Sequence, residues 1–278
     1  MRLILLLVFI LSSLLAPAAA AGVGEEMSLY VLNVGKADSM ILRSGENIYL
    51  IDTGRGSTMD VTESALKEEG ITHLDAVIIT HMDSDHVGGL KKLLKSDVTL
   101  DHIYVPAYFL QEEKDKENPA IKAAEKQGRE TEILEAGQTL PLGEGKITVL
   151  GPISPATDKE DNNSLVLLAE AAGGSILLGG DMEFPEEATL LRAGVIPRAD
   201  VLKVPNHGDG DATSEEFLRA VQPKIAVIST STEEKETTPD PRIMELLEQM
   251  NVETYQTQDS RTGVLVTLRD GEAAVEIR

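Results

Sequence analysis

The 278-residue sequence contains no cysteine, and this absence excludes several ways of stabilising or anchoring a protein. Disulfide bonds are impossible, and so is the lipid-modified N-terminal cysteine that tethers some exported proteins. Tryptophan is also missing, and aromatic residues make up only 3% of the chain. The core must therefore consist mainly of Leu, Ile, Val and Ala side chains, and stability must come from that core and from any bound metal.

Positive charge is scarce as well. Lys and Arg number 25 against 47 Asp and Glu, which gives a formal net charge of −22. Tight binding to nucleic acid requires many contacts between basic side chains and phosphates, so we expect no stable nucleic-acid complex. The charge does not exclude a phosphate-containing substrate, because a bound divalent cation can supply positive charge locally.

An apolar run near the N-terminus predicts a secretory signal over residues 1–21. Arg2 precedes the stretch from Leu3 to Leu15, and Pro17 and a run of alanines with Ala-x-Ala cleavage sequences follow. We therefore expect a secreted or otherwise extracytoplasmic protein with no transmembrane segment after cleavage. The alternative is an uncleaved anchor, because with the alanines the stretch approaches the roughly 20 residues that span a membrane.

Periodicity through the rest of the chain predicts alternating strands and helices. Short apolar runs between turn residues predict strands, whereas apolar residues at helical spacing predict helices. The expected strands lie near residues 27–35, 39–43, 47–54, 74–80, 146–152, 164–170, 175–181, 200–205 and 224–230, with closing strands near 253, 264 and 275. The expected helices lie near residues 60–69, 86–96 and 112–130, after 214 and after 242. This order predicts an α/β sandwich whose two sheets are both covered by helices.

The segment THMDSDHVGGL, residues 80–90, predicts a metal site. Four potential ligands lie directly after an apolar strand: His81, Asp83, Asp85 and His86. Positions 81, 83 and 85 point the same way if the chain is extended, and positions 85 and 86 fall where the next helix begins. His and Asp are common ligands of zinc, manganese and iron. The alternative, a capped helix with incidental histidines and surface carboxylates, does not explain four such groups in six positions.

Four segments, in order, resemble the metallo-β-lactamase fold family in the branch of the ComEC-type competence proteins. The segment THMDSDHVGGL is similar to the HxHxDH signature of the fold, in the HxDxDH form of this branch. The other three segments are LYVLNVGKADSMILRSGENIYLIDTG, DNNSLVLLAEAAGGSILLGGDME and VLKVPNHGDGDATSEEFLRAVQPKIAVIS. The resemblance implies one hydrolase domain over residues 22–278, folded as a four-layer αββα sandwich with a metal site at one edge between the sheets.

The resemblance also implies roles for individual residues. The matching metal ligands are His81 at the first site, Asp181 as the bridge between two sites, and Asp85, His86 and His207 at the second site. Asp83 occupies a signature position that carries His in most of the family, and it is expected as a further ligand. Asp52 of the DTG turn is expected to orient ligands more than to bind metal. Either Asp85 or Asp83 could take the proton of an attacking water as a general base.

The sequence departs from the family pattern at several positions. The mid-chain histidine of the family is missing, and EDNNS offers Asp161, Asn162 and Asn163 in its place. Asn206 replaces the first histidine of the usual HHG. The first site therefore has few nitrogen ligands, which shifts the preference from zinc towards manganese or magnesium. We expect one or two divalent ions.

Together these residues imply an exported metal-dependent hydrolase, most simply a phosphodiesterase or nuclease in which the cation activates a water molecule. The expected substrate is a small phosphoester or a nucleic acid. Lys203, Lys91 and Lys92 could contact its phosphates, or they are ordinary solvated lysines. Two alternatives stay open: an esterase or lactonase, and a non-catalytic or degenerate binding protein on the same fold.

Overall fold

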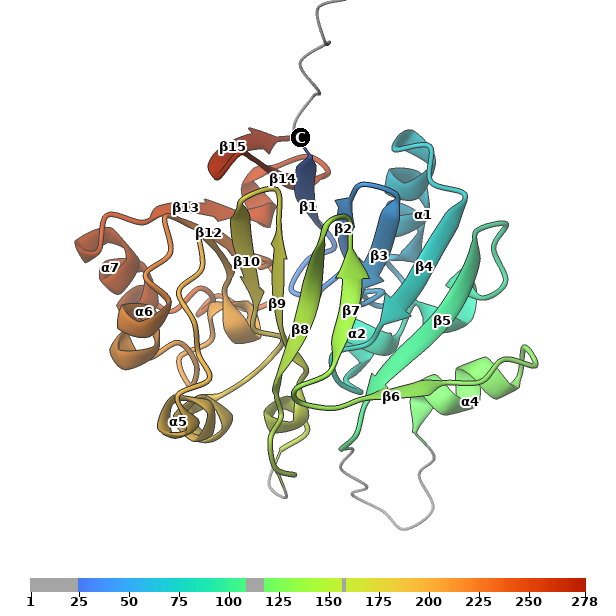
Figure 1. Cartoon of the computed structure of the whole chain (residues 1–278), viewed down its shortest axis with the longest axis horizontal. Helices are drawn as coiled ribbons and strands as arrows, with labels where there is room; N and C mark the ends of the chain where they lie inside the picture. The colour runs from blue at the N-terminus through green and yellow to red at the C-terminus, as the bar shows by residue number, and fades with distance from the viewer. Residues whose placement is uncertain (1–24, 109–117, 157–158) are drawn as a thin grey trace, which may run out of the picture.

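The computed structural model describes residues 25–108, 118–156 and 159–278. Two β-sheets lie face to face, with helices on both outer sides (Figure 1). The predicted signal at residues 1–21 lies outside the described residues, as does the part of the expected 112–130 helix before residue 118. Within the described part of the chain, no helix is long and apolar enough to cross a membrane.

The first sheet has the strand order β15-β14-β1-β2-β3-β4-β5-β6. These strands are β1 (Glu26–Leu32), β2 (Met40–Ser44), β3 (Asn47–Ile51), β4 (His73–Ile78), β5 (Thr99–Pro106), β6 (Glu132–Leu134), β14 (Gly263–Arg269) and β15 (Glu272–Ile277). The strands from β14 to β3 pair antiparallel, whereas those from β3 to β6 pair parallel. Parallel strands require crossover connections, which here contain α1 (Met59–Glu68), α2 (Ser84–Val87), α3 (Leu90–Leu93) and α4 (Pro119–Glu125).

The second sheet repeats this plan with the strand order β13-β12-β11-β10-β9-β8-β7. Its strands are β7 (Thr139–Leu142), β8 (Gly145–Gly151), β9 (Val166–Ala171), β10 (Gly174–Leu178), β11 (Val201–Lys203), β12 (Ile225–Ile228) and β13 (Glu253–Gln256). Its crossover helices are α5 (Phe184–Ala193), α6 (Glu215–Val221) and α7 (Pro241–Gln249), and its short 3₁₀ turns are η1 (Asp161–Asn163) and η2 (Pro205–Gly208). A further 3₁₀ turn, η3 (Thr257–Asp259), precedes β14.

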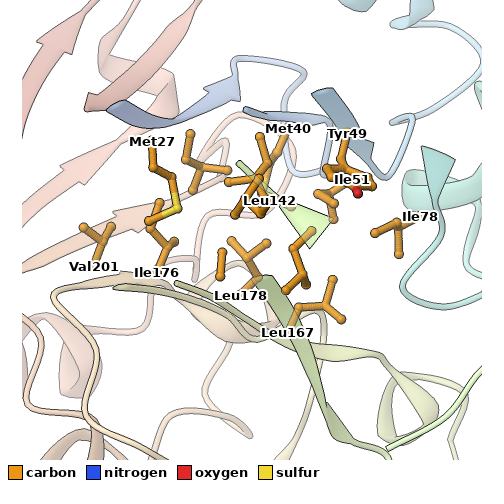
Figure 2. Close-up of a cluster of buried hydrophobic side chains, with 14 of the residues drawn as sticks. Met27, Met40, Tyr49, Ile51, Ile78, Leu142, Leu167, Ile176, Leu178 and Val201 are labelled. Carbon is orange, nitrogen blue, oxygen red and sulfur yellow. The ribbon is translucent and has the colours of Figure 1, made fainter. Parts of the chain in front are cut away.

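Three apolar layers hold the four structural layers together. Side chains alternate between the two faces of a strand, so each strand supplies two of these layers. In β4, Ala76 and Ile78 face the opposite sheet, whereas Val77, between them, packs under the helices of the first sheet. Figure 2 shows the middle layer, in which side chains from the two sheets meet. A third layer lies between the second sheet and α5, α6 and α7. This arrangement confirms the predicted αββα sandwich.

The sequence predictions missed strands β5, β6 and β7 and helix α5. In β5, buried Ile103 and Val105 alternate with polar or partly exposed residues, and β6 has only three residues. Helix α5 has a recognisable sequence signal, since Pro185 lies in its first turn and Gly194 follows its last residue with a φ of 67°. Proline at the start and glycine just past the end are typical of helices.

Candidate metal centre

The candidate metal centre lies at one edge of the sandwich, in the loops that leave four strands. Asp52 follows β3, the signature segment follows β4, Asp181 follows β10 and His207 follows β11. These strands belong to the parallel halves of the two sheets. The loops beyond the carboxyl ends of parallel strands are the usual place for ligands in α/β folds.

Asp181 lies at the centre of the cluster. Its Oδ2 atom is 3.2 Å from His86 Nε2, 3.2 Å from His207 Nε2 and 3.9 Å from His81 Nε2. The three imidazoles are fully buried, and the aspartate is 4% exposed. One carboxylate therefore faces three histidine nitrogens that come from two separate segments of the chain, which is what a bridging ligand requires.

Two groups of ligand atoms lie on either side of this carboxylate. We name Asp85, His86 and His207 the second half-site, and His81, Asp83 and Asp161 the first half-site. Within each group, one ligand atom from every residue lies within 4.8 Å of the others. The structure thus brings together all six residues that the sequence suggested as metal ligands. It adds Asp161, whose Oδ1 is 3.8 Å from His81 Nε2 and which stands in the segment where the family histidine is missing.

The two aspartates of the signature belong to different half-sites for a local reason. Asp83 has an extended conformation and is the N-cap of α2, whereas Asp85 lies inside that helix, where the sequence predicted a helix to begin. Residues 81, 83 and 85 therefore do not form one extended run. The turn between them directs Asp83 towards His81 and Asp85 towards His207. The sequence spacing predicted the ligands but not the half-site to which each of them belongs.

Close backbone packing fixes the signature segment against the DTG turn. Thr53 donates hydrogen bonds to the carbonyl oxygen of His86 from its backbone N–H (2.7 Å) and from its hydroxyl (2.8 Å). The backbone N–H of Gly89 donates to Gly54, and a Cβ on Gly89 would come within 2.3 Å of the Thr53 oxygen. Only glycine fits at this position, so the paired glycines allow the ligand-bearing turn to lie against its neighbour.

His86 is oriented by Asp52. The Nδ1–H of His86 donates to Asp52 Oδ2 over 2.7 Å, and the same carboxylate accepts hydrogen bonds from the backbone N–H and the hydroxyl of Thr80, each at 2.7 Å. With its hydroxyl proton given to Asp52, Thr80 Oγ1 accepts from His81 Nδ1 at 3.2 Å. Both imidazoles therefore turn Nε2 towards the centre, and Asp52 has the orienting place that the resemblance implied.

His207 is oriented by a second buried network. Its Nδ1–H donates to the carbonyl oxygen of Ser229 at 2.9 Å, and the hydroxyl of Ser229 donates to Asp38 in a short hydrogen bond. Asp38 also accepts from the ammonium group of Lys203 at 2.8 Å. Lys203 is fully buried, so the interpretation of it as a solvated lysine is wrong, and it contacts a carboxylate. Sequence reasoning missed Asp38, although it is the one acidic residue between the adjacent strands β1 and β2.

Two polar atoms in the centre have no partner. His81 Nε2 and Asp181 Oδ1 are buried and make no hydrogen bond within the described part of the chain. Leaving such groups unpaired costs about 1–3 kcal/mol each. A divalent cation between them would satisfy both atoms, and imidazole and carboxylate are suitable donors for manganese or zinc. The residues present therefore fit a metal.

Burial and charge act against each other in the second half-site. Burial disfavours ionisation of Asp181, but the charges of His207 and His86 hold the pKa of its carboxyl group well below the usual range. Burial also disfavours a charge on His86, yet Asp181 and Asp52 raise the pKa of its imidazole well above normal. In the metal-free protein, positive imidazole thus balances the carboxylate, and a metal would replace the proton on Nε2.

In the first half-site, burial instead favours the neutral forms of both the histidine and an aspartate. Burial, followed by repulsion from His86, lowers the pKa of His81 to about 4. Burial, followed by the charges of Asp181 and Asp83, raises the pKa of Asp161 to about 8. His81 is therefore a neutral ligand at neutral pH, whereas Asp161 must lose a proton before it can bind a metal.

The remaining candidate residues surround the centre without entering it. Asn206 donates from its side-chain amide to Asp211 at 3.2 Å, and Asn163 exchanges hydrogen bonds with the backbone of Ala156. Lys91 and Lys92 are exposed on α3. The left-handed φ of Asp52, Asn206 and His207, between 45° and 58°, places unusual backbone at the ends of β3 and β11. Such conformations gather at functional sites, where the surroundings hold them in place.

A family model described as the metallo-beta-lactamase superfamily matches residues 32–232. The chain belongs to this superfamily. ComE operon protein 3 of Bacillus subtilis is 30% identical over 258 residues, which cover 86% of this chain and 33% of that protein. Recombination protein 2 of Haemophilus influenzae is 31% identical over 72% of this chain and 24% of that protein. The chain thus spans one third or less of these relatives' lengths. The resemblance to ComEC-type competence proteins is confirmed.

Solved structures of metallo-β-lactamase proteins show the same fold. The metallo-beta-lactamase fold protein YhfI from Bacillus subtilis matches with a TM-score of 0.53 at 14% identity, and the match covers 88% of this chain and 99% of that one. A diphosphatase from the PhnP family matches with a TM-score of 0.52 at 13% identity over 88% and 97% of the two chains. With the family match and the buried His/Asp cluster, the fold is that of a metal-dependent hydrolase of this superfamily.

Proposed function

We propose that this chain is an exported metal-dependent phosphodiesterase that uses water as its nucleophile. One observation carries the proposal: three buried histidines turn Nε2 towards one buried aspartate, and two atoms of that cluster make no hydrogen bond to any described residue. A divalent cation bound there would supply Lewis acidity to a phosphoryl oxygen and would make water more acidic. Everything else is done by the protein's own side chains.

Some of those side chains would bind the cation, and others would transfer protons. Asp181, His86 and His207 are buried and would hold the cation, whereas Asp83 is exposed and can exchange protons with solvent. Arg55 lies beside the centre, with its guanidinium 3.6 Å from Asp85, and would meet the negative charge of a phosphoryl group. Asp85 or Asp83 is the general base of the proposal, because each lies within the cluster that a substrate's reacting atoms must reach.

The ligand set favours manganese or magnesium over zinc in this proposal. Four of the seven candidate ligands offer carboxylate oxygen, namely Asp83, Asp85, Asp161 and Asp181, and three offer imidazole nitrogen. Oxygen ligands suit the harder cations, while the three imidazoles keep zinc available as an alternative.

The second candidate function is a binding protein without catalysis, which the departures from the family pattern favour. The structure supports the enzyme more strongly. Asn206, which stands where the family has its first late histidine, directs its side-chain amide to Asp211. Asn206 thus has a structural partner outside the six-residue ligand set, and its alteration leaves that set complete.

Elemental analysis and a hydrolysis assay test the proposal together. Protein purified without chelator should contain manganese, zinc or magnesium, and the metal-loaded protein should hydrolyse bis-p-nitrophenyl phosphate. Metal without hydrolysis of phosphodiesters, nucleic acids, carboxyl esters or lactones would favour the binding protein. Hydrolysis of lactones or carboxyl esters with no action on phosphodiesters would replace the phosphodiesterase by the esterase or lactonase.

Export is part of the proposal because of the pattern in residues 1–21. N-terminal sequencing of protein recovered outside the cytoplasm should find a chain that begins near Ala21 or Gly22. Membrane-bound protein that keeps Met1 would show that the segment is an anchor.

A further inference from the structure

A niche suited to an anion lies beside the second half-site, where the loop between β1 and β2 meets Arg55. Its donors are the backbone N–H of Lys36 and the guanidinium group of Arg55. Gly35 has a φ of 80°, in the left-handed region that favours glycine, and the space that a Cβ would fill at this residue holds a carboxylate oxygen instead. We name Gly35, Lys36 and Arg55 the anion niche.

The carboxylate in the anion niche belongs to Glu234. Its Oε2 atom is 2.7 Å from Nη1 of Arg55, and its Oε1 atom accepts from the backbone N–H of Lys36 at 3.3 Å. Glu234 lies in residues 231–240, between β12 and α7, which we name the strap. An anion carried by the second sheet thus occupies donors that are carried by the first sheet.

Arg55 connects the anion niche to the metal centre. Its Nη1 atom contacts Glu234, whereas its Nη2 atom is 3.6 Å from Oδ2 of Asp85, a ligand of the second half-site. Nη2 also donates to the carbonyl oxygen of Lys36 at 2.6 Å, which fixes the guanidinium plane. A planar guanidinium can donate to two oxygens of one phosphoryl group. A phosphoryl group at the second half-site would therefore meet the same side chain that now binds Glu234.

The strap is anchored on both sides of Glu234 by other contacts. Before it, the backbone N–H of Thr232 donates to the side-chain oxygen of Gln258 at 2.8 Å. After it, the ammonium group of Lys235 forms an ion pair with Asp209. The position of the strap therefore does not depend on the carboxylate of Glu234, and this carboxylate can leave the anion niche while the strap stays in place.

The ion pair in the anion niche is also weak enough to be exchanged. The side chains of Arg55 and Glu234 are 31% and 40% exposed, unlike those of Lys203 and Asp38, which are fully buried. A solvent-exposed ion pair changes an equilibrium by about fivefold at most. A phosphoryl group that is held by the metal centre as well as by the arginine can therefore displace the glutamate.

We propose that the anion niche binds an oxygen of the substrate's phosphoryl group and that Glu234 is an autoinhibitory residue that blocks the niche in the free protein. The inference rests on the proposed phosphodiesterase function and adds a regulatory contact to it. Release of Glu234 offsets part of the substrate's binding free energy. Once the glutamate has been displaced, Arg55 contacts the ground state and the transition state alike. Glu234 should therefore raise KM and leave kcat unchanged.

Glu234→Gln tests the block because it keeps the shape of the side chain and removes its charge. In manganese, this variant should show a KM for bis-p-nitrophenyl phosphate about two- to fivefold below that of the parent, with the same kcat. An unchanged or higher KM would mean that Glu234 is only a structural contact and would overturn the proposal. Glu234→Ala should lower KM in the same way, which excludes an effect of the new amide.

The matched control is Glu233→Gln, one residue earlier in the strap. Glu233 is exposed and makes no hydrogen bond or ion pair within the part of the chain that the structure describes. Its variant removes the same charge and should keep the KM of the parent. An equal fall of KM in both variants would overturn the proposal in favour of a general loss of negative charge near the metal centre.

A binding measurement without metal tests the anion niche separately from catalysis. Inorganic phosphate is titrated by calorimetry into chelated protein, and Glu234→Gln should bind it about two- to fivefold more tightly than the parent. In an Arg55→Ala background, Glu234→Gln should change nothing, because the two residues act on the anion through one contact. The same gain in that background, or no gain over the parent, would overturn the proposal.

The two measurements separate failure of the anion niche from failure of the proposed function. If the parent hydrolyses no phosphodiester, the phosphodiesterase is refuted, and the phosphate titration in chelator still decides whether Glu234 competes with a phosphoryl anion for Arg55. If the parent is active but the variants of Glu234 keep parental KM and phosphate affinity, the hydrolase stands and the autoinhibitory contact is refuted.

Discussion

The two half-sites on either side of Asp181 are built differently. In the second half-site, two histidines are fully buried, and each has its Nδ1 atom fixed by a buried partner, Asp52 or Ser229. In the first half-site, His81 is the only nitrogen ligand, Asp83 is exposed, and Asp161 has a pKa raised to about 8. The second half-site is preorganised. The first half-site must lose the proton of Asp161 and order the exposed carboxylate of Asp83 before it can bind a metal.

This difference predicts unequal metal affinities. Fixed histidines lose little freedom when they bind a cation, and buried partners keep the correct nitrogen directed at it. Proton competition and side-chain ordering weaken the first half-site. We therefore expect the second half-site to hold its metal tightly and the first to bind a second ion weakly, so that full occupancy depends on metal concentration and pH.

The largest expected effect comes from breaking the second half-site at Asp85. Asp85→Asn keeps the shape of the side chain but removes both its charge and its basicity. Loss of a general base costs about 10²- to 10⁴-fold in rate, and weaker metal binding adds to this. We expect hydrolysis of bis-p-nitrophenyl phosphate to be abolished while circular dichroism shows a folded protein.

His102→Gln is the control for that variant, because His102 is exposed on β5 and contacts Glu132 outside the cluster. It should keep near-normal activity. Equal activity in the Asp85 and His102 variants would mean that the hydrolysis arises elsewhere.

The next effect tests the buried partners that hold the histidines. Asp52→Asn removes the negative charge that accepts from His86 and Thr80, and an amide oxygen replaces it as a weaker acceptor. Metal affinity should fall about 10- to 100-fold, which is typical when such an orienting partner is lost. Competition titration against a chromophoric chelator measures this.

Asp97→Asn, at an exposed position in the turn before β5, is the matched control and should bind metal like the parent. If the Asp52 variant also binds metal with parental affinity, preorganisation does not explain the tight half-site.

Measuring the melting temperature at increasing metal concentration compares the two half-sites directly. The expected effect is smaller than that of the substitutions above. After chelation, manganese should raise the melting temperature in two steps, because the ligands are joined only in the folded state. Each step approaches about 2.7 kcal/mol of stabilisation at a metal concentration one hundred times the dissociation constant. Asp161→Asn should remove the second, weaker step and preserve the first. No rise with manganese or zinc would refute the metal site.

The smallest effect is the pH dependence of the metal-free protein. Burial raises the pKa of Asp161 from 3.8 to about 8, so the folded state keeps a proton that the unfolded state has lost. The contribution of this group to stability is present below the lower pKa and is lost as pH rises through the higher one. Between about pH 5 and about pH 9, chelated wild-type protein should therefore lose stability relative to Asp161→Asn, by urea unfolding. A constant difference across this range would show that Asp161 titrates normally.

Sequence reasoning found most of the candidate site because the ligands follow recognisable strands. His81, Asp83, Asp85 and His86 are contiguous, and Asp181 ends an apolar run. It also found Asp52, which orients His86, but it missed the network that orients His207. Asp38 contacts Lys203 across 165 residues, and nothing in the local sequence of either residue predicts the other. Buried ion pairs between distant segments have no periodicity, so only the fold reveals them.

The fold was predictable to a similar extent and for a similar reason. Strands such as β1 and β4 have the apolar content that a doubly covered sheet demands. β5 and β6 were missed, since β5 carries polar residues on its exposed positions and β6 is only three residues long. Short strands gain their stability from the neighbours with which they pair, and those neighbours lie elsewhere in the sequence.

The sequence by itself determined the ligand types, the strand that precedes each of them and the superfamily to which the chain belongs. Tertiary structure alone decided which ligands belong to which half-site. The turn into α2 sends Asp83 and Asp85 to opposite sides of Asp181, and η1 brings Asp161 to His81. Local sequence fixes which chemical groups a segment carries, whereas their distances depend on how the apolar layers bring the segments together.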